Sequence, residues 1–461
     1  MKKVLCTVGI ILASMAGNAI ENPSTKGITA VSKPKNIIMV IADGMGPAYT
    51  TSYRYFNDDP ATEMIEETIF DRLVIGTSST YPASISGLVT DSAAAATALA
   101  SGIKTYNGAI GLDVNKKSAE TVLEFAKTQG KKTGIVVTSQ INHATPAAYL
   151  AHNKSRQNYN AIADSYIDNG IKADVYFGGG WQYFLRADRN LVDEFKAAGF
   201  QYIDNYNLLA DLDADKPVIG LFGNVGLPWA LDDNEPHRLS TMTKAAIKQL
   251  ENDQGYFMLI EASQVDWAGH ANDISAAMAE MTDLAITMEY LEKYAHQHPD
   301  TLVILTADHS TGGLTVGANG KYEWNPDILR TMNQSPSAIA TLLGKSKITQ
   351  EYVSKLLNFS VTESEVTQIQ QAKAYAIEQL ANYNQLNNDD RVKVKKPSKN
   401  KMISTAITKL IDLKTNTGWT SGGHTAIDVP VHALGKNSEM FAGQLDNTDI
   451  ANNIFKLLGK Q

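Results

Sequence analysis

Cysteine is almost absent from this 461-residue chain, because Cys6 is its only one, and this excludes a disulfide framework. The chain also lacks an excess of positive charge. Its 41 lysines and arginines stand against 49 aspartates and glutamates, giving a formal net charge of −8 without a long basic tract. This balance argues against a nucleic-acid-binding module. No internal repeat and no apolar run of about 18 residues, the length that predicts a membrane span, is present.

The N-terminus has the composition of a secretory signal. Lys2 and Lys3 precede a largely apolar stretch from Val4 to Ala16, and small residues follow up to Ala19. A membrane anchor is the alternative, but the stretch is too short to cross a bilayer. We therefore expect a signal peptide at residues 1–19, a mature chain of residues 20–461 without a cysteine or a membrane span, and a periplasmic or secreted protein.

The rest of the chain alternates predicted strands with predicted helices. Four short apolar runs end abruptly at a polar residue, namely 36–42, 133–137, 256–260 and 301–307. Helical periodicity follows Asp273, and a second helical segment spans 118–129 and stops at Gly130. With 43% hydrophobic residues, this pattern predicts an α/β fold with a central, mostly parallel sheet flanked by helices on both faces. Ligands bind at the carboxyl ends of strands in such sheets.

Residues 319–418 break this alternation. They are rich in Gln, Asn, Lys and Ser, contain a polar helical stretch at 362–380, and include the basic run 391–396. We interpret the segment as a mostly helical subdomain inserted into one catalytic domain. A run of charge of this kind is usually a solvated face or loop, and we expect the same here.

Acidic residues follow three of the predicted strands. Asp43, Glu261 and Asp308 would therefore meet at one edge of the sheet. Each taken alone is most often a helix cap or a turn residue. Asp266 and His270 follow Glu261 closely, and their i, i+4 spacing places both on one helical face, within reach of one metal ion. Oxygen and imidazole ligands together suit zinc.

Three of the nine histidines lie in glycine-rich settings: His270, His309 and His424. A lone histidine is more often a core or surface residue than a ligand. Together with the acids they give seven nitrogen and oxygen ligands, which is too many for one zinc. The sequence therefore predicts at least two metal ions.

Ser92 is the candidate nucleophile. It begins an alanine-rich helical segment, where backbone N–H groups and the helix dipole favour a phosphate. The alternative is a plain serine cap. No Gly-x-Ser-x-Gly elbow surrounds Ser92, and the histidines are better explained as metal ligands than as a general base. Metal ions can activate a serine hydroxyl instead.

Arg156 and Thr145 complete the candidate site. An arginine at such a position is most often a surface residue, but its planar fork can bind two phosphoryl oxygens. Thr145 offers a neutral oxygen that could join Asp43 and Glu261 around a harder ion such as magnesium. Spacing alone does not establish that third site.

Taken together, these motifs resemble the alkaline phosphatase family over most of residues 36–427, apart from the insertion. The resemblance implies a phosphoserine intermediate at Ser92, a phosphate clamp at Arg156, two zinc ions and one magnesium ion. The implied ligands are Asp266, His270 and His424 for one zinc, Asp43, Asp308 and His309 for the other, and Asp43, Thr145 and Glu261 for magnesium. It further implies small phosphomonoester substrates of broad range and a homodimer.

Two positions depart from the enterobacterial pattern. His143 stands where those members carry an aspartate near magnesium, and Trp267 stands where they carry a lysine that reaches phosphate through water. These departures leave the metal affinity and the pH optimum open, but not the type of reaction.

Other activities remain as alternatives. A phosphodiesterase of the same superfamily and an inactive phosphate- or metal-binding protein both fit the metal motifs. A sulfatase would need a modifiable Cys or Ser followed by Pro and Arg, whereas alanines follow Ser92.

Overall fold

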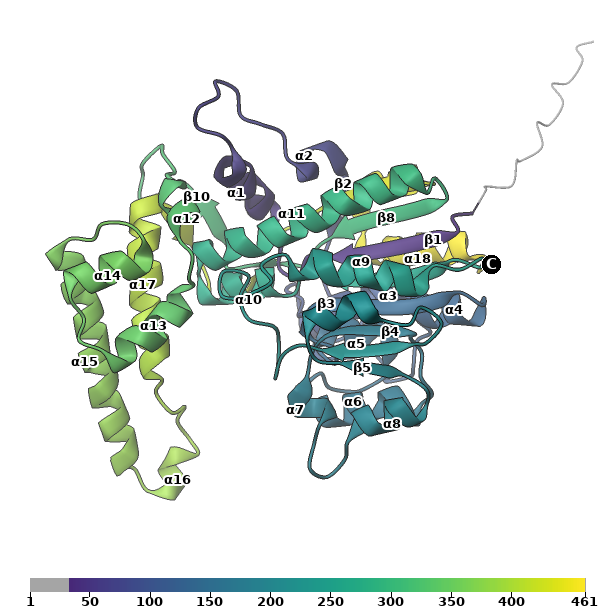
Figure 1. Ribbon diagram of the computed structural model, residues 1–461, viewed down its shortest axis with the longest axis horizontal. Coiled ribbons are helices and arrows are strands. Elements are labelled where there is room, and N and C mark those ends of the chain that lie inside the picture. The colour runs from purple at the N-terminus through teal and green to yellow at the C-terminus, as the bar shows by residue number, and fades with distance from the viewer. Residues whose placement is uncertain (1–32, 461) are drawn as a thin grey trace, which may run out of the picture. The chain divides into compact units, whose positions relative to one another are not determined.

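The structure, a computed structural model, describes residues 33–460 (Figure 1). The signal peptide expected at residues 1–19 lies outside the described residues. Within the described range, no helix is both long enough and apolar enough to cross a membrane.

A ten-stranded sheet forms the centre of the fold, in the order β14-β2-β13-β8-β1-β7-β3-β4-β6-β5. Its strands are β1 (Asn36–Ile41), β2 (Val74–Ser79), β3 (Lys132–Gln140), β4 (Val175–Gly179), β5 (Gln201–Ile203), β6 (Val218–Leu221), β7 (Tyr256–Glu261), β8 (Thr301–Thr306), β13 (Val429–Gly435) and β14 (Gly443–Asp446). β13 runs antiparallel to both of its neighbours, and every other pair is parallel. The prediction of a mostly parallel sheet is confirmed, with β13 making it mixed.

Side chains of β1 alternate between two separate cores. Ile38 and Val40 belong to one, while Ile37, Met39 and Ile41 belong to the other. The first core is covered by α1 (Pro47–Asn57), α2 (Ile69–Leu73), α9 (Arg238–Leu250), α10 (Gln264–Ala271) and α11 (Ile274–Gln297). The second is covered by α3 (Ser92–Ser101), α4 (Val122–Thr128), α5 (Ala144–Leu150), α6 (Tyr159–Asp168), α7 (Trp181–Phe184), α8 (Leu191–Ala197) and α18 (Asn447–Leu458). Helices therefore flank both faces, as predicted.

The two predicted helices differ in outcome. α11 begins directly after Asp273, whose carboxylate accepts hydrogen bonds from the first-turn amides, as expected. The helix predicted from residue 118 instead begins at Val122, because Thr121 and Glu124 form a capping box there. Ser118 pairs with Leu112 in an isolated β-bridge, which prevents an earlier helical start.

The segment 319–418 contains α12 (Asp327–Thr331), α13 (Pro336–Lys345), α14 (Gln350–Leu357), α15 (Glu363–Gln385), α16 (Asn388–Arg391) and α17 (Lys399–Thr415). Its two ends are held together because β10 (Leu314–Val316) and β11 (Thr417–Trp419) pair antiparallel. Buried residues of α17, including Ile403 and Ile407, join the core that α11 also contacts. Residues 392–396 of the basic run are exposed.

Candidate active site

Three neighbouring strands deliver carboxylates to one edge of the sheet. β1 lies between β8 and β7, so Asp43, Asp308 and Glu261 come together just beyond or at the ends of these strands. All three are fully buried. Gly44 has a φ of +78°, and a Cβ there would come within 2.7 Å of the Cα of Asp266. The close approach of the Asp43 turn to α10 therefore depends on glycine.

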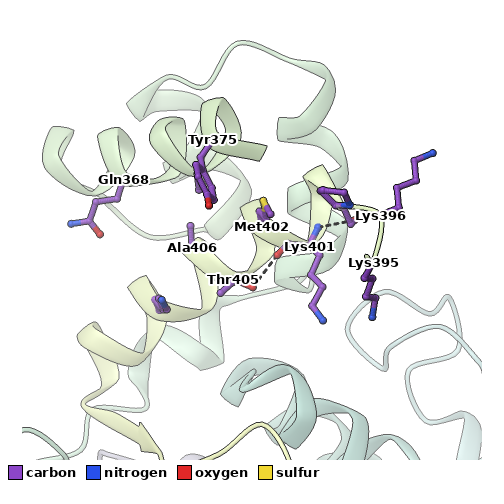
Figure 2. A pocket seen from close by; sticks show the side chains of 12 residues that line it. Gln368, Tyr375, Lys395, Lys396, Lys401, Met402, Thr405 and Ala406 are labelled. Atoms are coloured by element: carbon purple, nitrogen blue, oxygen red, sulfur yellow. Dashed lines mark hydrogen bonds between the residues drawn. The ribbon is translucent and has the colours of Figure 1, made fainter. Parts of the chain in front are cut away.

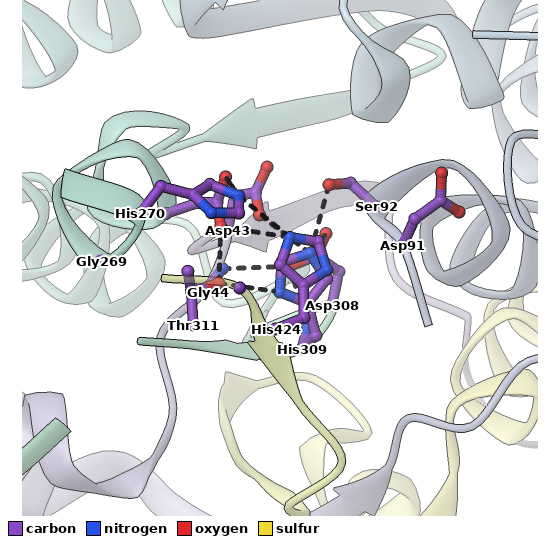
Figure 3. Close-up of polar contacts among 12 residues, drawn as sticks. Asp43, Gly44, Asp91, Ser92, Gly269, His270, Asp308, His309, Thr311 and His424 are labelled. Carbon is purple, nitrogen blue, oxygen red and sulfur yellow. Dashed lines mark hydrogen bonds and ion pairs between the residues drawn. The ribbon is translucent and has the colours of Figure 1, made fainter. Parts of the chain in front are cut away.

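One group of ligand-type side chains gathers around Asp266. α10 carries Asp266 and His270, with His270 Nε2 at 3.4 Å from Asp266 Oδ2. His424 joins them because β12 (His424–Thr425) pairs with β9 (Ser310–Thr311). Its Nε2 lies 3.6 Å from Asp266 Oδ1 and 3.2 Å from His270 Nε2 (Figure 3).

A second group lies beside the first and includes the candidate nucleophile. His309 Nε2 is 3.4 Å from Asp43 Oδ1 and 3.2 Å from Asp308 Oδ2. Ser92 Oγ lies 3.2 Å from the same nitrogen. The ring of His309 stacks on that of His424 at 3.6 Å, so the two groups are in contact.

His270 and His424 are each oriented by a backbone carbonyl that faces the other ring nitrogen, Nδ1. His270 Nδ1 is 2.7 Å from the carbonyl of Gly422, and His424 Nδ1 is 2.9 Å from that of Thr90. A ring nitrogen facing a carbonyl carries the proton, which leaves the Nε2 lone pair free. This arrangement is typical of metal-ligating histidines.

Ser92 is the first residue of α3 and is 1% exposed. Its neighbour Asp91 is the helix cap, because Asp91 Oδ1 accepts a hydrogen bond from the amide of Ala94 at 3.0 Å. The alternative that Ser92 is a plain cap is therefore wrong. Its hydroxyl instead faces His309, as Figure 3 shows.

Arg156 follows α5 in a loop, and its side chain is 16% exposed. Its Nη1 donates to Asp91 Oδ2 at 3.1 Å, and Nη2 lies 3.3 Å from His143 Nε2. Asp91 thus connects Arg156 to the start of the Ser92 helix. The alternative, an ordinary surface arginine, does not fit this mostly buried and paired side chain.

A third group surrounds Glu261. Glu261 Oε2 accepts a hydrogen bond from Ser139 at 3.2 Å, while Oε1 has no partner among the described residues. Thr145 Oγ1 is likewise buried without a partner. His143 offers a nitrogen within 4.8 Å of oxygens of both Asp43 and Glu261. The structure therefore brings His143 to ligand distance, although the sequence analysis gave it only a supporting position. Its ring meets Trp267 edge to face at 5.9 Å.

Burial shifts the titration of these groups. It raises the pKa of Asp43 well above its usual value, and the charges of Asp308 and Asp266 raise it further. Burial likewise raises the pKa of Asp308 to about 8 and that of Glu261 to about 7. Burial, with the charge of Arg156 next, lowers the pKa of His143 to about 3. Clustered buried carboxylates are unfavourable without a cation.

The donor set fits divalent metal ions. Both carboxylate oxygens of Asp43, and one each of Asp308 and Glu261, are buried and form no hydrogen bond with a described residue. Metal ions would pair with these oxygens and with the free Nε2 atoms. Three tight ligand groups are present: Asp266 with His309 and His424, Asp43 with Asp308 and His309, and Asp43 with His143 and Glu261.

Sequence reasoning missed three contributing residues. Thr311 Oγ1 donates to Asp266 Oδ1 at 2.5 Å and lies 3.2 Å from His309 Nδ1, so it joins the two groups. Thr311 stands two residues after His309, and Asp91 stands directly before Ser92. Their closeness in sequence to predicted site residues could therefore have indicated both. Nothing in the sequence indicates Ser139, which reaches Glu261 because β3 pairs with β7.

The chain is similar to known phosphatases along nearly its whole length. The sequence profile of the family described as alkaline phosphatase matches residues 34–460. Alkaline phosphatase 3 of Bacillus subtilis is 41% identical, with 97% of this chain and 96% of that protein covered. The crystal structure of a cold-active alkaline phosphatase from a psychrophilic Shewanella species is 45% identical, covers 92% of this chain and 100% of its own, and has a TM-score of 0.83. A TAB5 alkaline phosphatase with a histidine replaced by glutamate and magnesium bound is 26% identical, with a TM-score of 0.66 and coverage of 93% and 99%.

Proposed function

The chain belongs to the alkaline phosphatase family, and from this premise we propose that it hydrolyses small phosphomonoesters of broad range through a phosphoserine at Ser92. The observation that carries the proposal is the position of the Ser92 hydroxyl. It is buried at the start of α3 and lies 3.2 Å from Nε2 of His309, which belongs to two of the three groups of side chains that could hold metal ions.

Two zinc ions and one magnesium ion are the proposed cofactors. Asp266, His270 and His424 would hold one zinc, and Asp43, Asp308 and His309 the other. Asp43, Thr145 and Glu261 would hold magnesium. When bound, these ions supply Lewis-acid activation of hydroxyl groups and neutralise charge on the phosphoryl group. Support for the magnesium ligands comes from buried oxygens of Asp43, Glu261 and Thr145 that form no hydrogen bond with a described residue.

Residues of the chain supply the remaining chemistry. Ser92 Oγ attacks phosphorus in line, the alcohol leaves, and the phosphate remains on the serine. Water then attacks the phosphoserine and releases inorganic phosphate. The N-terminal amides of α3 face the transferred oxygens, and the guanidinium of Arg156 binds two of them. Asp91 holds Arg156 in place through its contact at 3.1 Å.

A monoester suits this site better than a diester. A monoester presents three free phosphoryl oxygens, whereas a diester presents one fewer to the arginine fork and the α3 amides. An inactive binding protein would not need a buried serine hydroxyl beside His309.

We further propose that His143 tunes the third metal site. Its nitrogen lies within 4.8 Å of oxygens of Asp43 and Glu261, and a neutral imidazole adds no negative charge for magnesium. Trp267, which packs against His143, takes the place of a lysine in the enterobacterial pattern. In a structurally similar TAB5 alkaline phosphatase, a variant with one histidine replaced by glutamate was solved with magnesium bound.

The remaining proposals concern the whole protein. They are a cleaved signal at residues 1–19, a periplasmic or secreted location, a homodimer, and one catalytic domain of residues 20–461 into which 319–418 is inserted.

The phosphoserine is tested by acid-quenched labelling with radioactive phosphate. The parent protein should carry label on Ser92, whereas Ser92→Ala should keep its metal content, lose the label and lose at least about 100-fold in rate. Metal content measured by mass spectrometry is the control for folding. Label on any other residue would overturn the assignment.

A further inference from the structure

The helical segment carries a surface groove that shares no lining residue with the candidate active site. The groove lies between α15 and α17 and has a volume of about 670 Å³ (Figure 2). Ala372 and Tyr375 line it from α15, while Met402 and Ala406 line it from α17. Tyr375 is 56% exposed, so a large aromatic side chain faces water at the groove.

Positive charge surrounds this apolar floor. Lys395, Lys396, Lys401 and Lys409 line the groove, and no acidic side chain does. Nearby Lys393 and Lys414 form ion pairs with carboxylates. The four lysines that line the groove form no ion pair within residues 33–460. The groove is therefore a local cationic and apolar site on a chain whose net charge is −8.

A second segment of the same chain has the complementary character. The loop between α1 and α2 contains the sequence Glu63-Met64-Ile65-Glu66-Glu67. Met64 is 77% and Ile65 52% exposed, and all three glutamates are exposed as well. None of these glutamates forms an ion pair with a described residue. Two adjacent exposed apolar side chains are thus flanked by unpaired carboxylates.

From this complementarity we propose that the 63–67 loop of one copy of the chain docks into the α15–α17 groove of a second copy. Met64 and Ile65 would cover Tyr375 and Met402, and the glutamates would meet the lysine rim. Figure 1 shows the α1–α2 loop well separated from α15 and α17, so the loop does not fill the groove of its own chain. Exposed apolar side chains with a charged rim are typical of protein interaction sites.

A charge-swap experiment tests the contact. One variant carries Lys395→Glu, Lys396→Glu, Lys401→Glu and Lys409→Glu, and the other carries Glu63→Lys, Glu66→Lys and Glu67→Lys. Each alone should associate at least about tenfold more weakly than the parent in sedimentation velocity at low salt, because like charges then face each other. An equimolar mixture should recover association, since opposite charges meet again in both directions. Lys347→Glu with Lys355→Glu is the matched control, because both lysines are exposed outside the groove.

Cross-linking shows whether the two segments meet. Met64→Cys is mixed with Met402→Cys and treated with a short bismaleimide. The cross-linked pair should form at least about tenfold faster than in a mixture of Met64→Cys with Leu208→Cys, whose second position is exposed elsewhere. Hydrolysis of a small phosphomonoester by each variant verifies folding. Equal cross-linking in both mixtures, or unchanged association of the charge-reversed variants, would overturn the proposal.

Discussion

Removing the hydroxyl of Thr311 should loosen the two ligand groups that it joins. Thr311→Val keeps the shape of the side chain, and with it the packing against Gly44 and Gly269, but leaves Asp266 Oδ1 and His309 Nδ1 without this partner. A hydrogen bond to a charged group contributes about 1.5–3 kcal/mol, and a neutral one about 0.5–1.5 kcal/mol. We therefore expect the metal-stripped variant to lose about 2–4 kcal/mol of unfolding free energy.

Urea unfolding of the metal-stripped protein measures this loss, and zinc titration measures its effect on binding. Loss of a group that orients metal ligands typically weakens metal affinity about 10- to 100-fold. Thr311→Ser is the control, because it keeps the hydroxyl and loses one methyl group, which contributes about 0.8 kcal/mol. The reasoning fails if Thr311→Val unfolds like the parent and binds zinc with the same midpoint.

Three further predictions follow from the site. Arg156→Lys should weaken inhibition by inorganic phosphate about tenfold or more, because an ammonium cannot form the bidentate fork, and an unchanged inhibition constant would contradict the clamp. His143→Asp should tighten magnesium binding by about 10- to 100-fold in the zinc-reconstituted enzyme, measured as the magnesium concentration that gives half of full activation. Equal midpoints for the parent and the variant would show that His143 does not tune the site. The pKa values of Asp308 and Glu261 in the metal-stripped fold, about 8 and about 7, lie above their ordinary values of 3.8 and 4.5. Their contribution to stability is therefore present below pH 4 and lost as pH rises through 7 to 8. The metal-stripped protein should unfold at a lower urea concentration at pH 9 than at pH 5. A urea midpoint that rises with pH would refute this sign.

Much of the sheet could be predicted because its central strands are buried on both faces. β1, β7 and β8 are continuous apolar runs, and the polar residues after or at their ends indicated the edge where ligands gather. β13 was not predicted. It contains Pro430 and His432, and a proline argues against a strand with two neighbours, since it cannot donate to the ladder.

The candidate site likewise contains some features that the sequence predicts and others that it does not. Residues that follow strands or share a helical face could be grouped from spacing, as Asp266 and His270 were. Contacts between separate segments could not be predicted from spacing, because they depend on how β3 pairs with β7 and how β9 pairs with β12. The approach of His143 to Asp43 and Glu261, and the link through Thr311, belong to this second kind.

The pairing of His424 with His270 also has a consequence for the order of folding. These two side chains are 154 positions apart, and the whole helical segment lies between them. Loop closure over such a length adds little to the free-energy cost, because each doubling of length costs only about 0.6 kcal/mol. Contacts between distant residues nevertheless form slowly. During synthesis the proposed ligand set is complete only after the C-terminal part of the chain has been made, so a nascent or truncated chain ending before residue 424 would lack one proposed ligand.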